Sequence, residues 1–239
     1  PSHPELLDWL TNTFRADGWS TKKLIRRLVL SQVFRQSGEV DQAAVELDPG
    51  NRLLHHYPTR RLEAEAIRDS LLAVSGSLDT RLFGPPINPV RSVEDPLKRL
   101  LSGPLDGEGR RSIYIEMSIM DPPKFLVGFN LPNPKLSTGR RDVTNVPAQA
   151  LLLLNHPLVT QMAKQWAEHL VIDGSETPKE RIGRMFVRAF CRSATSPELE
   201  RWIHAFEAFS QVEEKMNDKK AWAEMAHALY NTKEFIYYR

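Results

Sequence analysis

Apolar residues recur at helical spacing at both ends of this chain, and this pattern constrains the fold more than any other feature. Near the start, Ser2 and Glu5 have the spacing of a capping box and precede a helical stripe, while Ser20 is a second cap. Three later helix starts share a proline in or beside the first turn: Pro157, Thr177-Pro178 and Ser196-Pro197. The chain is therefore predicted to be mainly α.

A stretch rich in proline and glycine, as in Phe83-Gly84-Pro85-Pro86, separates the two helical regions. Long loops of this kind often carry function. Inside it, Ile113, Ile115 and Met117 alternate with Tyr114, Glu116 and Ser118, which predicts a minor β element near residues 112–118. An amphipathic helix from about Thr59 to Gly76 is expected just before this stretch.

A length of 239 residues suits one large domain. We expect a single domain over residues 1–239, with a helical region at residues 1–76, a loop-rich region at residues 77–145 and a C-terminal helical region at residues 146–239. The chain opens Pro1-Ser2-His3-Pro4 without Met or an apolar leader, so any targeting signal is expected upstream.

The composition of 41% hydrophobic and 26% charged residues is typical of a folded, soluble protein. The net charge of +2 comes from interleaved residues, 32 Lys and Arg against 30 Asp and Glu, which argues against nucleic-acid binding. The longest apolar run, Ala150 to Leu154, is far shorter than the ~20 residues that span a membrane. No membrane span is expected.

Cys191 is the only cysteine, so an internal disulfide, a cysteine-rich zinc site and covalent c-type haem attachment are excluded. Its place after Val187 and Phe190 predicts a small buried residue. The tryptophans are predicted to pack in the core, with Trp19, at a helix junction, as the exception. They are Trp9, Trp19, Trp166, Trp202 and Trp222.

Adjacent arginine pairs are the main candidate for chemistry. They are Arg26-Arg27, Arg60-Arg61, Arg110-Arg111 and Arg140-Arg141. Because guanidinium groups bind carboxylate, sulfate and phosphate through paired hydrogen bonds, one hypothesis is a convergent pocket for an anion. The other is a set of structural ion pairs that fasten loops to helices. The candidate residues for either role are Arg60, Arg61, Glu63, Glu65, Arg68, Asp69, Arg110, Arg111, Arg140, Arg141 and Asp142.

Signals for metal binding and catalysis are weak. Glu224 and His227 have the i, i+3 spacing of di-iron proteins, but a carboxylate-bridged site needs two such pairs and two further Glu, so no metal is expected. His55 and His56 have no nucleophile placed beside them by a known motif. Nucleophile elbows, phosphate loops and dinucleotide fingerprints are absent from the sequence, so the catalytic residues are unknown and an enzymatic role is left open.

Several long motifs resemble the C-terminal domain of unknown function in large planctomycete cytochrome C-like proteins. The motifs are Pro1-Ser2-His3-Pro4-Glu5-Leu6-Leu7-Asp8-Trp9-Leu10, Gly18-Trp19-Ser20, residues 60–69, Arg110-Arg111-Ser112-Ile113-Tyr114, Gly139-Arg140-Arg141-Asp142-Val143-Thr144, Pro147-Ala148-Gln149-Ala150-Leu151, Leu154-Asn155 and Asn231-Thr232-Lys233-Glu234-Phe235. The resemblance implies an upstream haem-binding region, a companion domain and export, hence an extracytoplasmic or periplasmic location. It implies no cofactor within this chain and no catalytic residue. Many members have Phe-Asp where this chain has Phe129-Asn130. This difference weakens any proposal that makes the carboxylate at this position catalytic.

Three functional hypotheses follow. The first is a noncatalytic interaction or assembly module that packs against upstream domains of the same haem-containing protein or against other extracytoplasmic proteins. The second is an enzyme or receptor domain that binds an anionic substrate, such as a sulfated or acidic polysaccharide, with nearby carboxylates as acids or bases. Its converging arginines would be Arg60, Arg61, Arg110, Arg140 and Arg141. Nucleic-acid binding is the least favoured.

Overall fold

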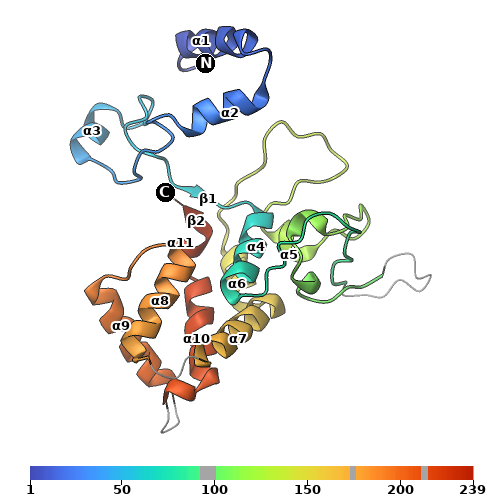
Figure 1. Cartoon of the computed structure of the whole chain (residues 1–239), viewed down its shortest axis with the longest axis vertical. Helices are drawn as coiled ribbons and strands as arrows, with labels where there is room; N and C mark the ends of the chain where they lie inside the picture. The colour runs from blue at the N-terminus through green and yellow to red at the C-terminus, as the bar shows by residue number, and fades with distance from the viewer. Residues whose placement is uncertain (92–100, 173–175, 211–214, 239) are drawn as a thin grey trace. The chain divides into compact units, whose positions relative to one another are not determined.

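The computed structural model describes residues 1–91, 101–172, 176–210 and 215–238, and it is mainly α, as predicted (Figure 1). A portion of the predicted loop-rich region, residues 92–100, lies outside the described residues. The helices are α1 (Pro4–Ala16), α2 (Thr21–Val29), α3 (Gln42–Leu47), α4 (Ala64–Ser75), α5 (Lys124–Gly128), α6 (Pro147–Asn155), α7 (Pro157–Val171), α8 (Pro178–Phe190), α9 (Ser196–Phe209), α10 (Lys219–Tyr230) and α11 (Lys233–Ile236). The short 3-10 helices are η1 (Gly107–Gly109), η2 (Ser112–Tyr114) and η3 (Lys215–Asn217). Strands β1 (Arg60–Arg61) and β2 (Tyr237–Tyr238) pair in a small sheet.

The chain divides into two compact units, one of residues 1–60 with 237–239 and one of residues 61–236. The expectation of a single domain stays a prediction. Within the described residues, no helix combines the length and apolar character needed to cross a membrane.

The first unit contains α1, α2 and α3, and none of these helices has a buried residue. Ser20 caps α2 by accepting a hydrogen bond from the Lys23 N–H, as predicted. The predicted capping box at Ser2 is wrong, because the helix begins at Pro4 and His3 is its cap. Trp9 is 53% exposed, so its predicted place in the core is also wrong, while Trp19 is 66% exposed.

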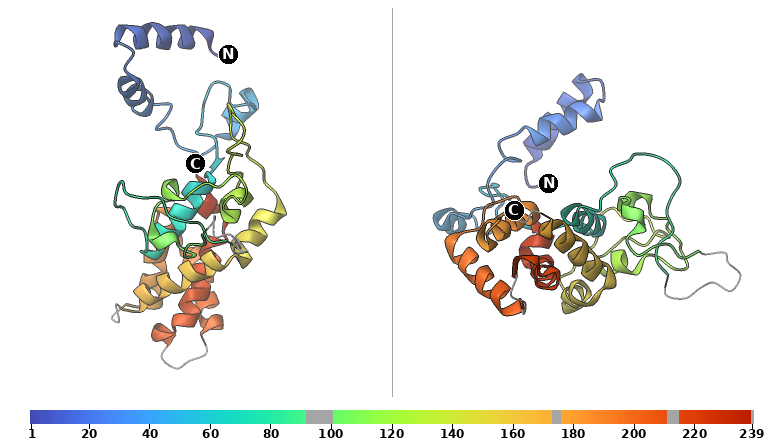
Figure 2. Two further views of the ribbon diagram at one scale, coloured as in Figure 1. Left: turned by 90° about the vertical axis from the view of Figure 1, so that its right-hand side faces the viewer. Right: turned by 60° about the horizontal axis from the view of Figure 1, so that its bottom comes forward.

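The second unit carries the hydrophobic core, in which α7 packs against α10 and α4 packs against α7 (Figures 1 and 2). Trp166 of α7 contacts Tyr230 of α10, with ring centroids 5.5 Å apart. Trp222 stacks on Phe206 of α9 at 4.1 Å. Buried Leu158, Met162, Trp166 and Leu170 recur every four residues along α7, so one face of this helix fills the centre of the unit.

The predicted helix starts in the C-terminal region are largely confirmed. Thr177 and Glu180 form a capping box at α8, and Pro147 opens α6. At α9 the box is formed by Thr195 and Glu198, one residue before the predicted cap. Cys191 is exposed, so its predicted burial is wrong. The reason is that α8 ends at Phe190 and Cys191 takes the left-handed conformation that turns the chain away.

The predicted minor β element near residues 112–118 is present only as one isolated bridge, not as a strand. Ser112–Tyr114 form η2, and Ile115 makes an isolated parallel bridge to Ile87. The alternation does not match burial, because Ile115 is buried whereas Ile113, on the same predicted face, is 77% exposed. The helix expected from Thr59 begins only at Ala64, because Arg60 and Arg61 are extended in β1.

Candidate functional site

Helix α4 presents Arg68 and Asp69 to the loop that contains η1 and η2. The buried Arg68 guanidinium donates hydrogen bonds to the carbonyl oxygens of Asp106 (2.6 Å) and Arg110 (2.9 Å). Asp69 accepts a 2.7 Å bond from the Ser112 N–H and lies 3.3 Å from Arg111 Nε. Burial lowers the pKa of Arg68, whereas the negative charges of Asp69 and Asp106 raise it. The Arg68 guanidinium therefore stays a cation near neutral pH.

Arg110 is buried, in contrast to its exposed neighbour Arg111. Its Nη2 donates to the Phe83 carbonyl oxygen at 2.7 Å and its Nη1 to that of Arg81 at 3.2 Å. Its guanidinium lies 3.9 Å from the centroid of the Tyr114 ring, a cation–π contact. Arg110 therefore ties residues 81–83 to the η2 segment.

Arg61 is buried and is surrounded by acceptors from the segment between α5 and α6 and from the first turn of α6. It donates to the Phe129 carbonyl oxygen (3.1 Å), Asn130 Oδ1 (2.6 Å) and Gln149 Oε1 (2.9 Å), and also to the Thr144 carbonyl oxygen. Asn130 also accepts from the Thr144 N–H and hydroxyl, so this network closes residues 129–149 into a fixed loop.

Arg141 forms a paired hydrogen bond with Glu65 of α4, at 2.7 and 3.0 Å, and lies 3.2 Å from Glu63. Burial raises the pKa of Glu65, but the hydrogen bonds and charge of Arg141, together with a main-chain hydrogen bond, leave this pKa below its usual value. The pKa of Arg141 is raised for the same reason. This ion pair attaches the 129–149 loop to the start of α4.

The candidate residues do not form one cluster. Arg61 and the Arg141–Glu63–Glu65 group both hold the 129–149 loop, whereas the Arg68–Asp69–Arg110–Arg111 group holds the 81–83 and 106–112 segments. Arg140 and Asp142 are both exposed. Arg60 is exposed in the first unit, where its guanidinium lies 5.9 Å from the centre of the Tyr57 ring.

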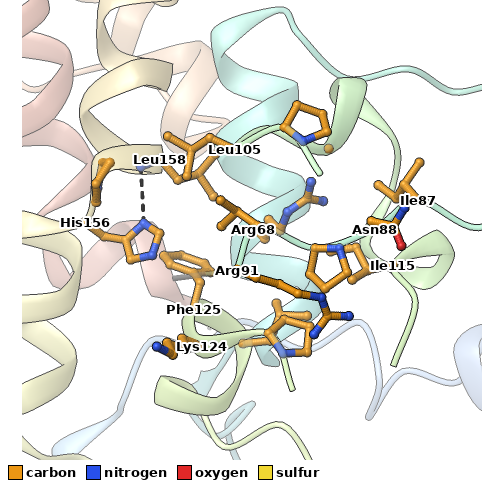
Figure 3. A pocket seen from close by; sticks show the side chains of 17 residues that line it. Arg68, Ile87, Asn88, Arg91, Leu105, Ile115, Lys124, Phe125, His156 and Leu158 are labelled. Atoms are coloured by element: carbon orange, nitrogen blue, oxygen red, sulfur yellow. Dashed lines mark hydrogen bonds between the residues drawn. The ribbon is translucent and has the colours of Figure 1, made fainter. Parts of the chain in front are cut away.

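A cavity of about 240 Å³ lies in the second unit, and its lining combines apolar side chains with cations (Figure 3). Arg68 lines it from α4, and Lys124 and Phe125 from α5. His156 and Leu158 line it at the start of α7. Residues 87–91, which include Arg91, form a further part of its wall. A second hollow of about 660 Å³ is lined by residues 81–88, 102–104, Glu108 and Arg110.

His156 caps α7, since its Nδ1 accepts a hydrogen bond from the Leu158 N–H at 3.2 Å (Figure 3). Burial lowers the pKa of His156, so the ring is neutral near pH 7. Because Nδ1 accepts, the ring proton is on Nε2.

Sequence reasoning did not identify Arg91, Lys124 or His156. The signal for His156 was its position directly before Pro157, where a helix begins. Arg91 lies in an irregular segment, where no periodicity distinguishes an inward side chain. Among the residues that the structure describes, no group of three His, Cys, Asp or Glu side chains is placed to hold a metal ion.

The chain matches a family model described as PSD1, protein of unknown function (DUF1553), over residues 1–206. The match includes all of α1 to α8 and ends within α9. Comparison with curated proteins and with solved structures found no match.

Proposed function

The chain belongs to the PSD1 family of proteins of unknown function (DUF1553), and we propose that it is an assembly module whose α1–α2 helices dock on another protein surface. The observation that carries the proposal is the lack of buried residues at the start of the chain. Residues 1–60 are all described, and none of them is buried. A segment of this size without a core of its own gains stability by covering its apolar side chains.

The exposed apolar side chains of this segment follow the helical stripes of α1 and α2. They include Leu6, Leu7, Trp9, Ile25, Leu28 and Val29. Single exposed apolar residues are ordinary on protein surfaces, but contiguous apolar patches mark interaction sites, and large aromatic side chains are enriched there. The stripes of α1 and α2 therefore support a docking role.

Charge defines the partner. Lys22, Lys23 and Arg26 are exposed on the polar side of α2, and Asp17 lies 2.8 Å from Arg27 and 3.9 Å from Lys23. The complementary surface is a protein surface with an apolar centre and carboxylates at its rim. An anionic membrane fits less well, because Glu5 and Asp8 are exposed on the neighbouring helix α1.

We infer that this partner surface belongs to an upstream domain of a longer, extracytoplasmic haem-containing protein. This step rests on the sequence resemblance described above. Haem belongs to the upstream region in this proposal, and the chain itself is assigned no cofactor.

The alternative of an anionic-polysaccharide site at Arg60, Arg61, Arg110, Arg140 and Arg141 stays a prediction. It is not proposed further, because Arg61 and Arg110 direct their guanidinium groups at carbonyl oxygens of their own chain. A nucleic-acid partner is disfavoured by the net charge of +2.

The test is hydrogen exchange of the amides of residues 4–30, measured in this chain alone and in the full-length protein from which it comes. Docking predicts at least about tenfold slower exchange in the full-length protein, a change of about 1.4 kcal/mol in opening free energy. Leu28→Glu should remove this protection, while Thr11→Glu, at another exposed position, should leave it. Equal exchange in both proteins, or protection already complete in the chain alone, would contradict docking.

Two further measurements distinguish the proposed protein partner from a second copy of the chain and from a membrane. Light scattering of the chain should give a monomer mass, since a dimer that Leu28→Glu dissociates would identify a second copy as the occupant. Sedimentation with phosphatidylglycerol vesicles should leave the chain in solution. Binding to the vesicles would replace the protein partner with a membrane.

A further inference from the structure

The lining of the cavity described above combines basic and apolar side chains, with Arg91 paired to Asp121 at 3.0 Å and Arg68 lying 3.8 Å from Asp69. Its lining includes the cations Arg68, Arg91 and Lys124, and the described lining residues contain no carboxylate. The remaining walls are mostly apolar, with Ile87, Leu105 and Phe125 among them. Low-polarity walls weaken water screening and strengthen the attraction of such cations for an anion.

Arg91 is the central residue of this inference. Its side chain is 2% exposed and reaches three acceptor atoms. Nε donates to the Leu101 carbonyl oxygen at 3.0 Å, and Nη1 donates to the Asp121 carbonyl oxygen at 2.8 Å and to Asp121 Oδ2 at 3.0 Å. Its Nη2 is buried and has no hydrogen-bond partner among the described residues. A buried guanidinium N–H without an acceptor is costly, and a ligand oxygen would satisfy it.

The geometry points to a site for a small organic carboxylate with an apolar body. The carboxylate would accept a hydrogen bond from Arg91 Nη2, and the apolar body would pack against Phe125 and Leu105. His156 adds a donor, because its Nδ1 accepts from Leu158 and its proton is on Nε2. This inference concerns the second unit and is independent of the docking proposed for α1 and α2.

Gly107 keeps the site open. Its φ is +60°, and a Cβ there would lie 2.6 Å from Ile87 Cδ1 and 2.7 Å from Arg68 Nη2. A side chain would therefore push the two lining residues apart. The volume of about 240 Å³ lies below the range of about 300–1,000 Å³ of typical ligand pockets, so the ligand is small.

The test is calorimetric titration of the intact chain at pH 7 with three probes: octanoate, octanamide and acetate. Octanoate has the charge and the apolar body, whereas octanamide lacks the charge and acetate lacks the body. Octanoate should bind at least about tenfold more tightly than either of the others. Equal binding of octanamide, equal binding of acetate, or no binding of octanoate would each overturn the proposal.

Variants locate the site. Arg91→Gln should weaken octanoate binding by at least about tenfold. Arg81→Gln is the matched control, because Arg81 is also paired with an aspartate, at 3.1 Å from Asp79, but lines only the second hollow. An equal loss in both variants would show nonspecific attraction and overturn the assignment. If circular dichroism shows that Arg91→Gln is unfolded, the comparison of the three probes on the unaltered chain decides whether the proposed carboxylate binding occurs.

Discussion

At the scale of single residues, the buried arginines act through main-chain carbonyl oxygens. Arg61, Arg68 and Arg110 each donate to at least two acceptors from loops remote in sequence. Arginine suits this role because its five N–H donors are held in one plane and it keeps its charge. Carbonyl groups buried beneath a loop need such donors, since they have no sheet or helix partner.

Replacing Arg61 tests whether these hydrogen bonds stabilise the fold. Arg61→Gln is expected to lower the free energy of unfolding by about 2–4 kcal/mol, because several acceptors lose their donor at once. Arg60→Gln is the matched control on the same strand and, being exposed, should change it by less than about 0.5 kcal/mol. Urea unfolding measures both. Equal effects would mean that the hydrogen bonds of Arg61 contribute little.

Glu198 should make stability depend on pH. The hydrogen bonds from Arg192, followed by that from the Thr195 N–H, lower its pKa from 4.5 to about 2. A carboxyl with a lowered folded-state pKa stabilises the protein above about pH 4.5, and this contribution is lost as the pH falls toward about 2. The difference in unfolding free energy between the protein and Glu198→Gln should therefore shrink between pH 5.5 and about 2.5.

Urea titrations at several pH values measure this difference. Glu200→Gln, exposed on the same helix, is the control and should give a smaller difference. A difference for Glu198→Gln that stays constant over the acid range would contradict the assigned role of the Arg192 contact.

The sequence identified the arginine pairs but not which member of each pair faces inward. Neighbouring residues in extended backbone point to opposite sides, so one arginine of 60–61 and one of 110–111 is buried. That choice depends on which side the core lies, and the core is formed by α4, α7 and α10. Arg91 and His156 could not be predicted for the same reason.

At the scale of elements, helix starts were predictable because their signals are local. A proline in the first turn and a side-chain cap specify the start of α8 without help from the rest of the chain. Residues 112–118 could not be assigned in this way. Their alternation predicts a strand, but Arg68 and Asp69 bind Ser112 at the start of a 3-10 turn, and no neighbouring strand among the described residues completes a sheet there.

Gly109 is expected to be essential for the η1 segment. Its φ is +70°, and a Cβ would collide with the Ser77 carbonyl oxygen. Gly109→Ala should therefore lower the free energy of unfolding by about 2 kcal/mol or more. Gly139→Ala is the control, since nothing lies within 4 Å of a Cβ there, and it should change stability by less than about 0.5 kcal/mol. Thermal unfolding followed by circular dichroism compares the two, and similar melting temperatures would contradict the steric argument.

At the scale of the whole molecule, the mainly α class is confirmed but the distribution of the core was not predictable. Apolar stripes on α1 and α2 look the same in sequence as the stripe on α7, yet only α7 of these three helices has buried side chains. Periodicity reports that a helix has an apolar face. It does not report what covers that face.

A chain of residues 61–239 should fold without the first sixty residues. All of the buried hydrophobic residues described lie between Ala64 and Phe235. The melting temperature is expected to change by no more than about 4 °C, equivalent to about 1 kcal/mol. Calorimetry on both chains checks this. Failure of the shorter chain to unfold cooperatively would favour the single domain predicted from the sequence.

The arginine contacts to carbonyl oxygens also bear on how such a protein can diverge during evolution. A loop held by its main chain imposes few requirements on its own side chains, because every residue except the donor supplies the same carbonyl group. Residues 81–83 and 106–110 can therefore accumulate substitutions while the loop path persists, provided that Arg68, Gly107, Gly109 and Arg110 are kept. In a library of all single substitutions, these four positions should tolerate fewer replacements than the loop residues around them.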